Sequence, residues 1–371
     1  MKLKIKQNII MEHLNYVIKG ISNKNLIPIY NCIKLELKDE GLYLLSTDSD
    51  IVIKTFIPKK DIEEVIELGE VVISGKYIYE IIRKLSGFIN IEEVVDSKLF
   101  IFTDNSSFNL NCNPASDYPD IDLEGTKTPI ILRKKVFKTI ISEIAYAAST
   151  REDNIYTGIN LKINQDNLEC ISTDSHRLAL KRIKLTETIE NSINIIIPTK
   201  NLNELIKLFK EEDGELELHI FNNKIIFKFD DIIFKTSLIN GKYPDVSKLI
   251  PNEFSLTMTT NLNDYYDAID RASLLTKESE KNTIKFESKN NKVIISSTIP
   301  EIGRVEETIE VNKDRNEEIK IAFNSKYMID ALRVLESENI QLLFNGDIKP
   351  IIIKTPDNES LIQLIVPIKT Y

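Results

Sequence analysis

Three consecutive residues, Asp174, Ser175 and His176, carry the groups of a hydrolytic triad: a carboxylate, a hydroxyl nucleophile and an imidazole base. The residues around them predict a β-strand, in which neighbouring side chains point to opposite faces. Ser175 would then point away from the side that Asp174 and His176 share. The spacing therefore favours a structural or partner-contacting role over catalysis.

Two acidic pairs, Asp48 with Asp50 and Asp230 with Asp231, could suggest the metal site of a nuclease. Each pair lies where a strand end or a hairpin turn is predicted, and the sequence places no third acid beside either. The three cysteines and three histidines lack zinc-site spacing, and no glycine-rich phosphate loop is present. We therefore predict no catalytic residue, no metal and no cofactor.

The composition is that of a folded protein with more than one domain. The chain has 371 residues, of which 42% are apolar and 28% charged. No apolar run reaches the roughly 18 residues of a membrane helix, and the first residues lack a signal-peptide layout. We expect a cytoplasmic protein without membrane contact. The net charge of −9 argues against a simple basic nucleic-acid binder unless the charge is unevenly distributed.

The chain repeats itself three times. Helical segments with apolar residues at i, i+3, i+4 and i+7 begin near Ile9, Lys134 and Asn261, about 126 residues apart. A second set begins at Ser74, at Pro198-Thr199 and at Asn324, where side-chain oxygens can cap the first turn. Period-two stretches rich in Ile, Val, Phe and Thr lie between the helices and predict strands.

The turns share the same period. Tyr118-Pro119-Asp120 closes the first unit, Tyr243-Pro244-Asp245 the second, and Val366-Pro367 the third. Each unit thus predicts strand, helix and three strands, twice over. The expected fold class is α+β, with three tandem repeats of a two-helix, antiparallel-sheet domain. We place these domains at residues 1–125, 126–251 and 252–371.

The predicted helices differ in charge from the rest of the chain. Together they carry +8, which leaves −17 on the remaining residues to give the total of −9. A basic face on an acidic protein can hold a polyanion in one place without reading its sequence.

Several motifs, together with the three-fold repeat, resemble those of one known family. They are Thr173 to Ala179 (TDSHRLA), Tyr243-Pro244-Asp245, Phe323 to Tyr327 (FNSKY) and Val366 to Lys369 (VPIK). The whole chain resembles the beta subunit of bacterial DNA polymerase III, the replication sliding clamp. The resemblance implies a ring-shaped homodimer that encircles double-stranded DNA. It also implies a non-catalytic processivity factor that serves a DNA-directed DNA polymerase in DNA replication.

Helix dimensions support a dimer. Six helices about 10 Å wide would enclose a hole of under about 10 Å, too narrow for a duplex roughly 20 Å across. Twelve helices would leave a hole near 28 Å, so a head-to-tail pair of half rings is expected. The third domain should meet the first domain of the partner subunit.

The resemblance also implies partners and site residues. The expected partners are the replicative polymerase alpha subunit, a clamp loader and other proteins that carry clamp-binding motifs. The implied peptide pocket comprises Tyr156, Thr173, Ser175, His176, Arg177, Leu178, Pro244, Lys248, Leu249, Asn324, Tyr327, Ile348, Pro350, Val366, Pro367, Ile368 and Lys369. His176 and Arg177 are expected at its rim. Ser175 stands where the family commonly has glycine, Tyr156 where leucine is frequent, and the C-terminus lacks the family's methionines.

The residues expected to face DNA are basic and lie on the predicted helices or close to them. They are Lys24, Arg83, Lys138, Lys200, Lys207, Lys210, Lys326 and Arg333. The alternative function left open by the residues alone is a nucleic-acid-processing enzyme on a repeated α+β scaffold.

Overall fold

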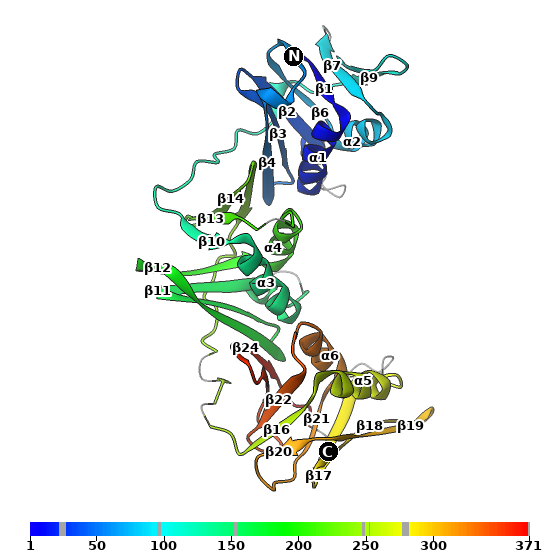
Figure 1. The fold of residues 1–371 in the computed structure, drawn as a ribbon, viewed down its shortest axis with the longest axis vertical. Helices are drawn as coiled ribbons and strands as arrows, with labels where there is room; N and C mark the ends of the chain where they lie inside the picture. Colours follow the sequence, from blue (N-terminus) through cyan, green and yellow to red (C-terminus); the bar gives the residue numbers. More distant parts are fainter. Residues whose placement is uncertain are drawn as a thin grey trace. The chain divides into compact units, whose positions relative to one another are not determined.

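The computed structural model describes residues 1–21, 27–94, 98–151, 155–211, 213–246, 249–251, 253–276 and 282–369. The chain forms two compact units (Figure 1). Unit 1 comprises Met1–Phe137 and Glu204–Leu238, and unit 2 comprises Lys138–Asn203 and Ile239–Tyr371. Within the described ranges, no helix is both long enough and apolar enough to span a membrane.

The predicted order of strands and helices recurs in the first and third sets, each with one additional short strand, whereas two long strands take the place of the four predicted between the helices of the second set. The first set is β1 (Lys2–Lys6), α1 (Gln7–Val17), β2 (Cys32–Lys38), β3 (Gly41–Thr47), β4 (Ile51–Pro58), β5 (Glu64–Glu67), β6 (Gly69–Ser74), α2 (Gly75–Lys84), β7 (Phe88–Val94), β8 (Lys98–Phe102) and β9 (Ser107–Asn111). The second set is β10 (Ile130–Arg133), α3 (Lys134–Ile144), β11 (Gly158–Thr173), β12 (Arg177–Pro198), α4 (Thr199–Ile206), β13 (Glu215–Ile220), β14 (Lys224–Phe229) and β15 (Ile232–Ser237). The third set is β16 (Leu256–Asn261), α5 (Leu262–Ser273), β17 (Thr283–Lys289), β18 (Lys292–Ile299), β19 (Gly303–Glu310), β20 (Asn312–Lys313), β21 (Lys320–Asn324), α6 (Ser325–Arg333), β22 (Asn339–Phe344), β23 (Ile351–Thr355) and β24 (Asn358–Ile365).

Every sheet is antiparallel, and two of the sheets combine strands from different repeats. Unit 1 holds the sheets β5-β1-β7-β8-β9 and β10-β13-β14-β15-β4-β3-β2-β6. Unit 2 holds β11-β12-β24-β23-β22-β16-β20 and β19-β18-β17-β21. The pairs β4–β15 and β12–β24 join strands of successive repeats. The predicted domain boundaries fall between β9 and β10 and between β15 and β16, and they stay predictions.

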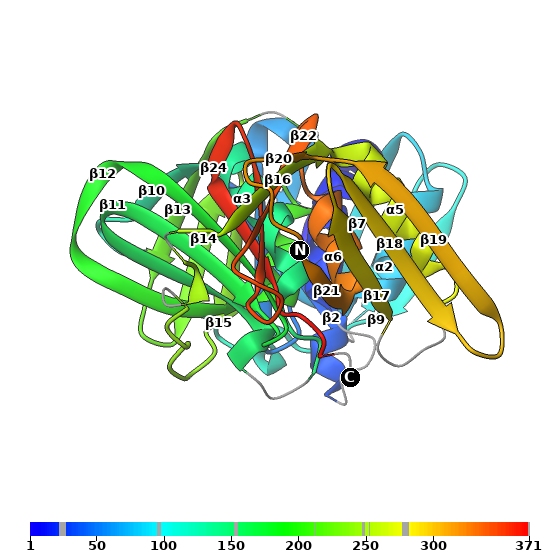
Figure 2. The ribbon, with the colours of Figure 1, turned by 90° about the horizontal axis from the view of Figure 1, so that it is seen from below.

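Each helix packs on its sheet through one face, as the 3.6-residue period predicts. In α5 the buried face comprises Tyr265, Ala268, Ile269 and Ala272, at spacings of three and four residues. Figure 2 shows α5 beside β18 and β19, whose inward side chains complete this core. Fully burying one Ile side chain stabilises the fold by about 1.5–3 kcal/mol, so these faces dominate the folding energy.

The predicted helix caps are only partly correct. Asn324 Oδ1 accepts from the Lys326 and Tyr327 amides at 2.9 and 3.2 Å and so caps α6. Asn261 caps α5 in the same way. Ser74 precedes α2, but its side chain makes no capping hydrogen bond, so the prediction for Ser74 was wrong. Ser74 is also the last residue of β6, where its backbone pairs with Cys32.

A hydrogen-bonded turn joins β11 to β12, where a continuous strand was predicted through residues 174–176. The Thr173 hydroxyl donates to the Arg177 carbonyl at 2.5 Å and accepts from the Ser175 amide at 3.1 Å. The amides of His176 and Arg177 both donate to Asp174 Oδ1 at 3.0 Å. Hydrogen bonds between the short Thr and Asp side chains and nearby backbone groups thus take the place of the backbone hydrogen bonds of a continuous strand. The Asp174 carboxylate therefore stabilises this turn.

The first repeat contains the same turn between β3 and β4. The Thr47 hydroxyl donates to the Ile51 carbonyl at 2.7 Å and accepts from the Ser49 amide at 3.1 Å. Asp48 Oδ1 accepts from the Asp50 and Ile51 amides at 3.0 and 2.9 Å. The Asp48 carboxylate, which belongs to one of the acidic pairs in the sequence, thus bonds to amides of this turn.

Both turns place a serine in the left-handed backbone region, with φ of 82° at Ser49 and 75° at Ser175. An L-residue pays a steric cost there that glycine avoids, although glycine loses more entropy on folding. Glycine would therefore fit the position of Ser175 without this steric cost.

We expect Ser175→Gly to change the free energy of unfolding by less than about 1 kcal/mol, because relief of strain and added chain entropy nearly cancel. Ser175→Val should lower it by about 1–3 kcal/mol, because a β-branched side chain fits poorly at positive φ. Urea unfolding of the two variants, with Ser49→Gly and Ser49→Val as the matched pair, measures the difference. Equal stability of the Gly and Val variants would contradict this assignment.

Candidate functional site

Arg177, the first residue of β12, is the centre of a charged and aromatic cluster in unit 2. Its Nε lies 3.0 Å from Asp174 Oδ2, and its Nη1 lies 2.7 Å from Asp330 Oδ2 on α6. Its guanidinium carbon lies 4.6 Å from the ring centre of Tyr327 and 5.4 Å from that of Tyr146. Only 9% of Arg177 is exposed. The guanidinium is thus neutralised and fixed between two rings, and its free donors are few.

The ring of His176, in the turn just before β12, stacks on the ring of Tyr327 on α6, with ring centres 6.2 Å apart and planes 15° apart. His176 itself is exposed. Of the two residues expected at the rim, His176 is therefore exposed to solvent. Arg177 is buried and ion-paired to Asp174 and Asp330.

An apolar cluster lies next to this charged one. Leu178, Tyr243 and Val246 are buried together with side chains of β22, β23 and β24, and Tyr156 packs against them half-buried. The rings of Tyr156 and Tyr243 meet edge to face at 5.9 Å. Burial raises the pKa of the Tyr243 phenol, which therefore stays neutral.

The C-terminal segment runs across the start of β12. The Val366 amide donates to the His176 carbonyl at 2.8 Å, and the Ile368 amide donates to the Ala322 carbonyl at 2.7 Å. Val366 and Lys369 are exposed, while Pro367 and Ile368 are half-buried. The segment after β24 therefore lies beside the turn at 173–177, as the sequence predicts.

The remaining residues of the predicted pocket have different surroundings. Ile348 is 72% exposed between β22 and β23, and Leu249 is 50% exposed. The Asn324 side chain is occupied in capping α6. Pro244 and Pro350 are half-buried. Lys248 lies outside the described residues.

The sequence did not point to two members of the charged cluster, Asp330 and Tyr146. Asp330 follows Tyr327 by three residues on the same helix, so helical periodicity would have placed it on the same side. Tyr146 lies just beyond α3 and carries no motif that could have identified it.

The matching strands of the first repeat do not form a comparable apolar surface. Leu178 and Leu180 pair with Leu364 and Ile362 in β12–β24. After the equivalent turn between β3 and β4, the corresponding pairs in β4–β15 are Val52 with Lys235 and Lys54 with Ile233. Two of the four apolar positions are thus lysines in the first repeat. The apolar surface belongs to unit 2 because of these substitutions and not because of its turn.

Seven of the eight residues expected to face DNA lie within the described ranges, and all seven are exposed. Arg83, Lys138, Lys326 and Arg333 lie on α2, α3 and α6, and Lys200 lies on α4. Lys207 and Lys210 follow α4, which ends at Ile206, earlier than the sequence predicts. Lys24 lies outside the described residues.

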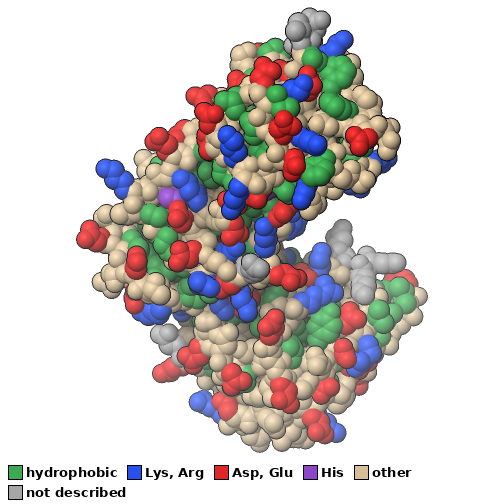
Figure 3. All heavy atoms as spheres, turned by 45° about the horizontal axis from the view of Figure 1, so that its top comes forward, with side chains coloured by type: hydrophobic (Ala, Val, Ile, Leu, Met, Phe, Trp, Pro, Cys, Tyr) green, Lys and Arg blue, Asp and Glu red, His purple; other side chains and the backbone are tan. Residues whose placement is uncertain are grey.

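Acidic neighbours moderate this positive charge. Arg83 pairs with Glu80 at 2.6 Å, and Lys207 pairs with Glu204 at 2.7 Å. Lys210 pairs with Glu12 at 2.7 Å. Figure 3 shows Lys and Arg side chains interspersed with Asp and Glu on the face that it draws. Exposed pairs of this kind contribute only about 0–1 kcal/mol, so they leave the lysines and arginines available to a polyanion.

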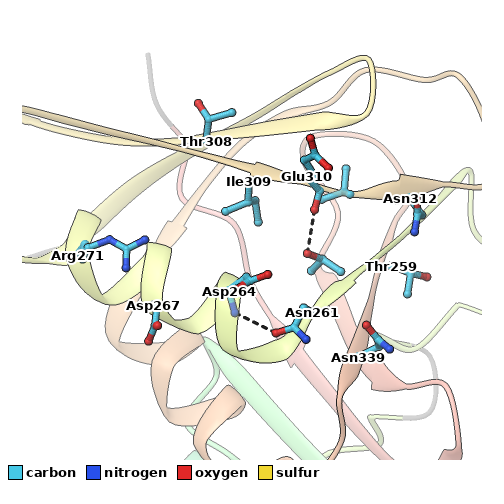
Figure 4. Close-up of a pocket in the computed structure, with 12 residues that line it drawn as sticks. Thr259, Asn261, Asp264, Asp267, Arg271, Thr308, Ile309, Glu310, Asn312 and Asn339 are labelled. Carbon is cyan, nitrogen blue, oxygen red and sulfur yellow. Dashed lines mark hydrogen bonds between the residues drawn. The ribbon is translucent and has the colours of Figure 1, made fainter.

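A polar cavity of about 540 Å³ lies between α5 and β19 (Figure 4). Asp264, Asp267 and Arg271 line it from the helix, and Thr308 and Glu310 from the strand. None of its lining residues belongs to the predicted pocket. Among the described residues, no group of three or more His, Cys, Asp or Glu side chains is arranged to hold a metal ion.

Family models match the chain in three successive segments. The N-terminal, central and C-terminal domains of the DNA polymerase III beta subunit match residues 1–122, 131–245 and 247–369. The beta sliding clamp of Staphylococcus epidermidis is 37% identical over 377 residues, which covers 100% of both chains. That of Bacillus subtilis is 36% identical, also at full coverage.

Solved structures agree with these matches. The crystal structure of the DNA polymerase sliding clamp from Bacillus subtilis superposes with a TM-score of 0.95 at 36% identity and full coverage of both chains. The DNA polymerase III beta chain of Streptococcus pneumoniae gives 0.96 at 31%, again at full coverage.

These similarities confirm the predicted three-domain clamp fold of helices and antiparallel sheets. They also confirm the prediction of a non-catalytic sliding clamp over that of a nucleic-acid-processing enzyme. The chain belongs to the family of bacterial DNA polymerase III beta subunits, the beta sliding clamps.

Proposed function

We propose that this chain closes with a second copy into a head-to-tail ring around double-stranded DNA and tethers the replicative polymerase alpha subunit through the pocket of unit 2. The observation that carries the proposal is the full-length match to beta sliding clamps. A clamp loader would open the ring, and other proteins with clamp-binding motifs would share the pocket. The work would take place in the cytoplasm.

The apolar cluster around Leu178 supports the role of unit 2 in peptide binding. Its half-buried Tyr156 and the exposed Leu249 and Val366 offer apolar surface to a ligand. An extended peptide with Leu or Phe anchors suits such a surface, since backbone hydrogen bonds can fix its register. His176 would offer the polar contact at its rim.

Edge strands support ring closure. Within the described residues, β9 and β19 each end a sheet and have one unpaired side. Phe108 on β9 is 36% exposed, and Leu274, just after α5, is 59% exposed. Covering such edges and apolar side chains with a second copy removes a risk of open-ended pairing. We place Phe108 and Leu274 at the interface between subunits.

The exposed cations on the helices support a loose hold on DNA. Lys138 and Lys326 would contact phosphates without reading bases, and salt would weaken those contacts strongly. Retention on DNA would then come from the closed ring and not from affinity.

We expect the clamp, once loaded on nicked circular DNA, to stay bound in salt that abolishes its binding to a short linear duplex. Encirclement is topological and does not depend on salt. Phosphate contacts weaken as salt rises, because the release of counterions from DNA on binding becomes less favourable. Gel filtration of loaded DNA measures retention, and cutting the circle with a restriction enzyme should release the protein. Equal loss from intact circles and linear duplexes would contradict encirclement.

We expect Phe108→Asp and Leu274→Asp each to convert the dimer to a monomer of 42.6 kDa, because each places a carboxylate in a buried apolar contact. Sedimentation velocity measures the mass. Val136→Asp, at a residue 39% exposed on α3, is the matched control and should leave the dimer intact. A dimer in both interface variants would refute this placement.

We expect Tyr156→Ala to weaken binding of a clamp-binding peptide from a bacterial polymerase alpha subunit by about tenfold or more, as the loss of an aromatic anchor does. Deletion of residues 366–371 should abolish binding. Calorimetry measures both, and thermal unfolding checks the fold. Tyr30, which stands two residues before β2 as Tyr156 stands two before β11, supplies the control Tyr30→Ala. Equal effects of the two Tyr substitutions would remove this pocket from consideration.

A further inference from the structure

The outer face of the sheet β5-β1-β7-β8-β9 in unit 1 carries alternating lysines and phenylalanines. Its inner face is an ordinary core of Leu3, Ile5, Ile89, Ile91, Leu99 and Ile101, all buried. The outer face presents Lys2, Lys4 and Lys6 on β1, Phe88 on β7, and Phe100 and Phe102 on β8. A sheet with one solvated face normally places polar side chains there, so three phenylalanines need an explanation.

Strand register makes these side chains neighbours. Lys6 lies opposite Phe88 in the β1–β7 ladder. In successive rows, Lys4, Asn90 and Phe102 stand side by side, and so do Lys2, Glu92 and Phe100. Figure 1 shows β1 and β7 adjacent in unit 1. The face is therefore one continuous patch built from three strands.

The lysines on this patch are positioned by the aromatic rings. Lys4 Nζ lies 5.1 Å and Lys6 Nζ 5.7 Å from the ring centre of Phe88, within the range of cation–π attraction. Phe88 is 39% exposed, and Phe100 and Phe102 are partly exposed.

The charge on the patch is only partly balanced. Lys2 pairs with Glu92 at 2.9 Å. On the other side of β1, Glu67 and Glu64 of β5 lie opposite Lys2 and Lys4 in the β1–β5 ladder. Over the described part of the chain, however, neither Lys4 nor Lys6 has a carboxylate within ion-pair distance. The patch thus offers two cations without an ion pair and accessible rings in a protein whose net charge is −9. These two cations would attract an anionic ligand to this place.

We propose that this patch binds single-stranded nucleic acid. Alternate residues of an antiparallel strand are about 6.8 Å apart, so Lys2, Lys4 and Lys6 form a line of cations that matches phosphates along an extended strand. Phe88, Phe100 and Phe102 offer flat rings on which unpaired bases stack, as they do on the sheets of known single-strand binders. A duplex hides its base faces and would leave these rings unused. Binding is independent of base sequence, and it involves neither the peptide pocket nor the ring.

The chain contains no tryptophan, so Phe88→Trp introduces a single indole into the patch. We expect an unlabelled 15-mer of thymidylate to quench the emission of this indole, because a base stacks on it. A duplex of equal length should not quench it. Fluorescence anisotropy of the labelled 15-mer gives the affinity of the unsubstituted dimer for comparison.

Two variants separate stacking from charge. Phe88→Ala should weaken binding at least about fivefold, the effect of losing one base–aromatic stack. Lys4→Glu with Lys6→Glu should reduce the slope of log affinity against log salt by about 1.4, since each phosphate contact on a single strand contributes about 0.7. Lys59→Glu with Lys60→Glu makes the same charge change at exposed lysines of the same unit and should leave the slope unchanged. Thermal unfolding verifies that each variant is folded.

Three outcomes would overturn the proposal. The first is unchanged emission of the indole at saturating oligonucleotide. The second is an equal loss of affinity in the Lys59/Lys60 control, which would mean general electrostatic attraction. The third is equal quenching by polyglutamate, which would assign the patch to acidic polypeptides.

Discussion

The antiparallel pairing of β12 with β24 is the constraint on which the candidate pocket depends. It brings the start of the second repeat's strand, at Arg177, beside the end of the third repeat's last strand, at Ile365. One register places Leu178 opposite Leu364 and leaves the C-terminal segment next to the turn at 173–177. A shift by one residue would turn every one of these side chains to the other face. The candidate pocket and the C-terminal segment are thus positioned by a single ladder.

Arg177 secures this arrangement from the charged side. Its guanidinium bonds to Asp174 within its own turn and to Asp330 on α6, and two tyrosine rings enclose it. Losing one partner of such a pair costs more than the pair contributes, because a charge is left with little solvent. Arg177 therefore links strand, turn and helix, and His176 is left to face solvent. The same argument covers Lys134 on α3, whose buried ammonium lies 2.6 Å from Asp230.

Internal repetition also shows how one scaffold supports different surfaces. The turns at Thr47 and Thr173 have the same hydrogen bonds and the same left-handed serine. The strands that follow differ, because Lys54 and Lys235 stand where Leu180 and Leu364 stand in unit 2. An apolar peptide would have to desolvate those lysines, so the first repeat is a poor second pocket. Repetition of backbone geometry therefore does not imply repetition of function.

The sequence by itself determined the local structure and the family. The 3.6-residue period placed Tyr265 and Ile269 on the buried face of α5, and the period-two stretches located the strands. Thr173 to Ala179 and Val366 to Lys369 carried the resemblance to sliding clamps. These features could be predicted because a residue's own neighbours along the chain decide them.

Only the tertiary structure decided which distant groups meet. Arg177 and Asp330 are 153 residues apart, and no local pattern pairs them. The turn at 174–176 replaced a predicted strand, since side-chain bonds to amides competed with the ladder. The alternation Lys2, Lys4, Lys6 is visible in the sequence, but the phenylalanines beside it come from β7 and β8, which only strand register brings alongside. Ladders between distant strands depend on the packing of the whole chain, and for that reason the sequence could locate the elements but not their partners.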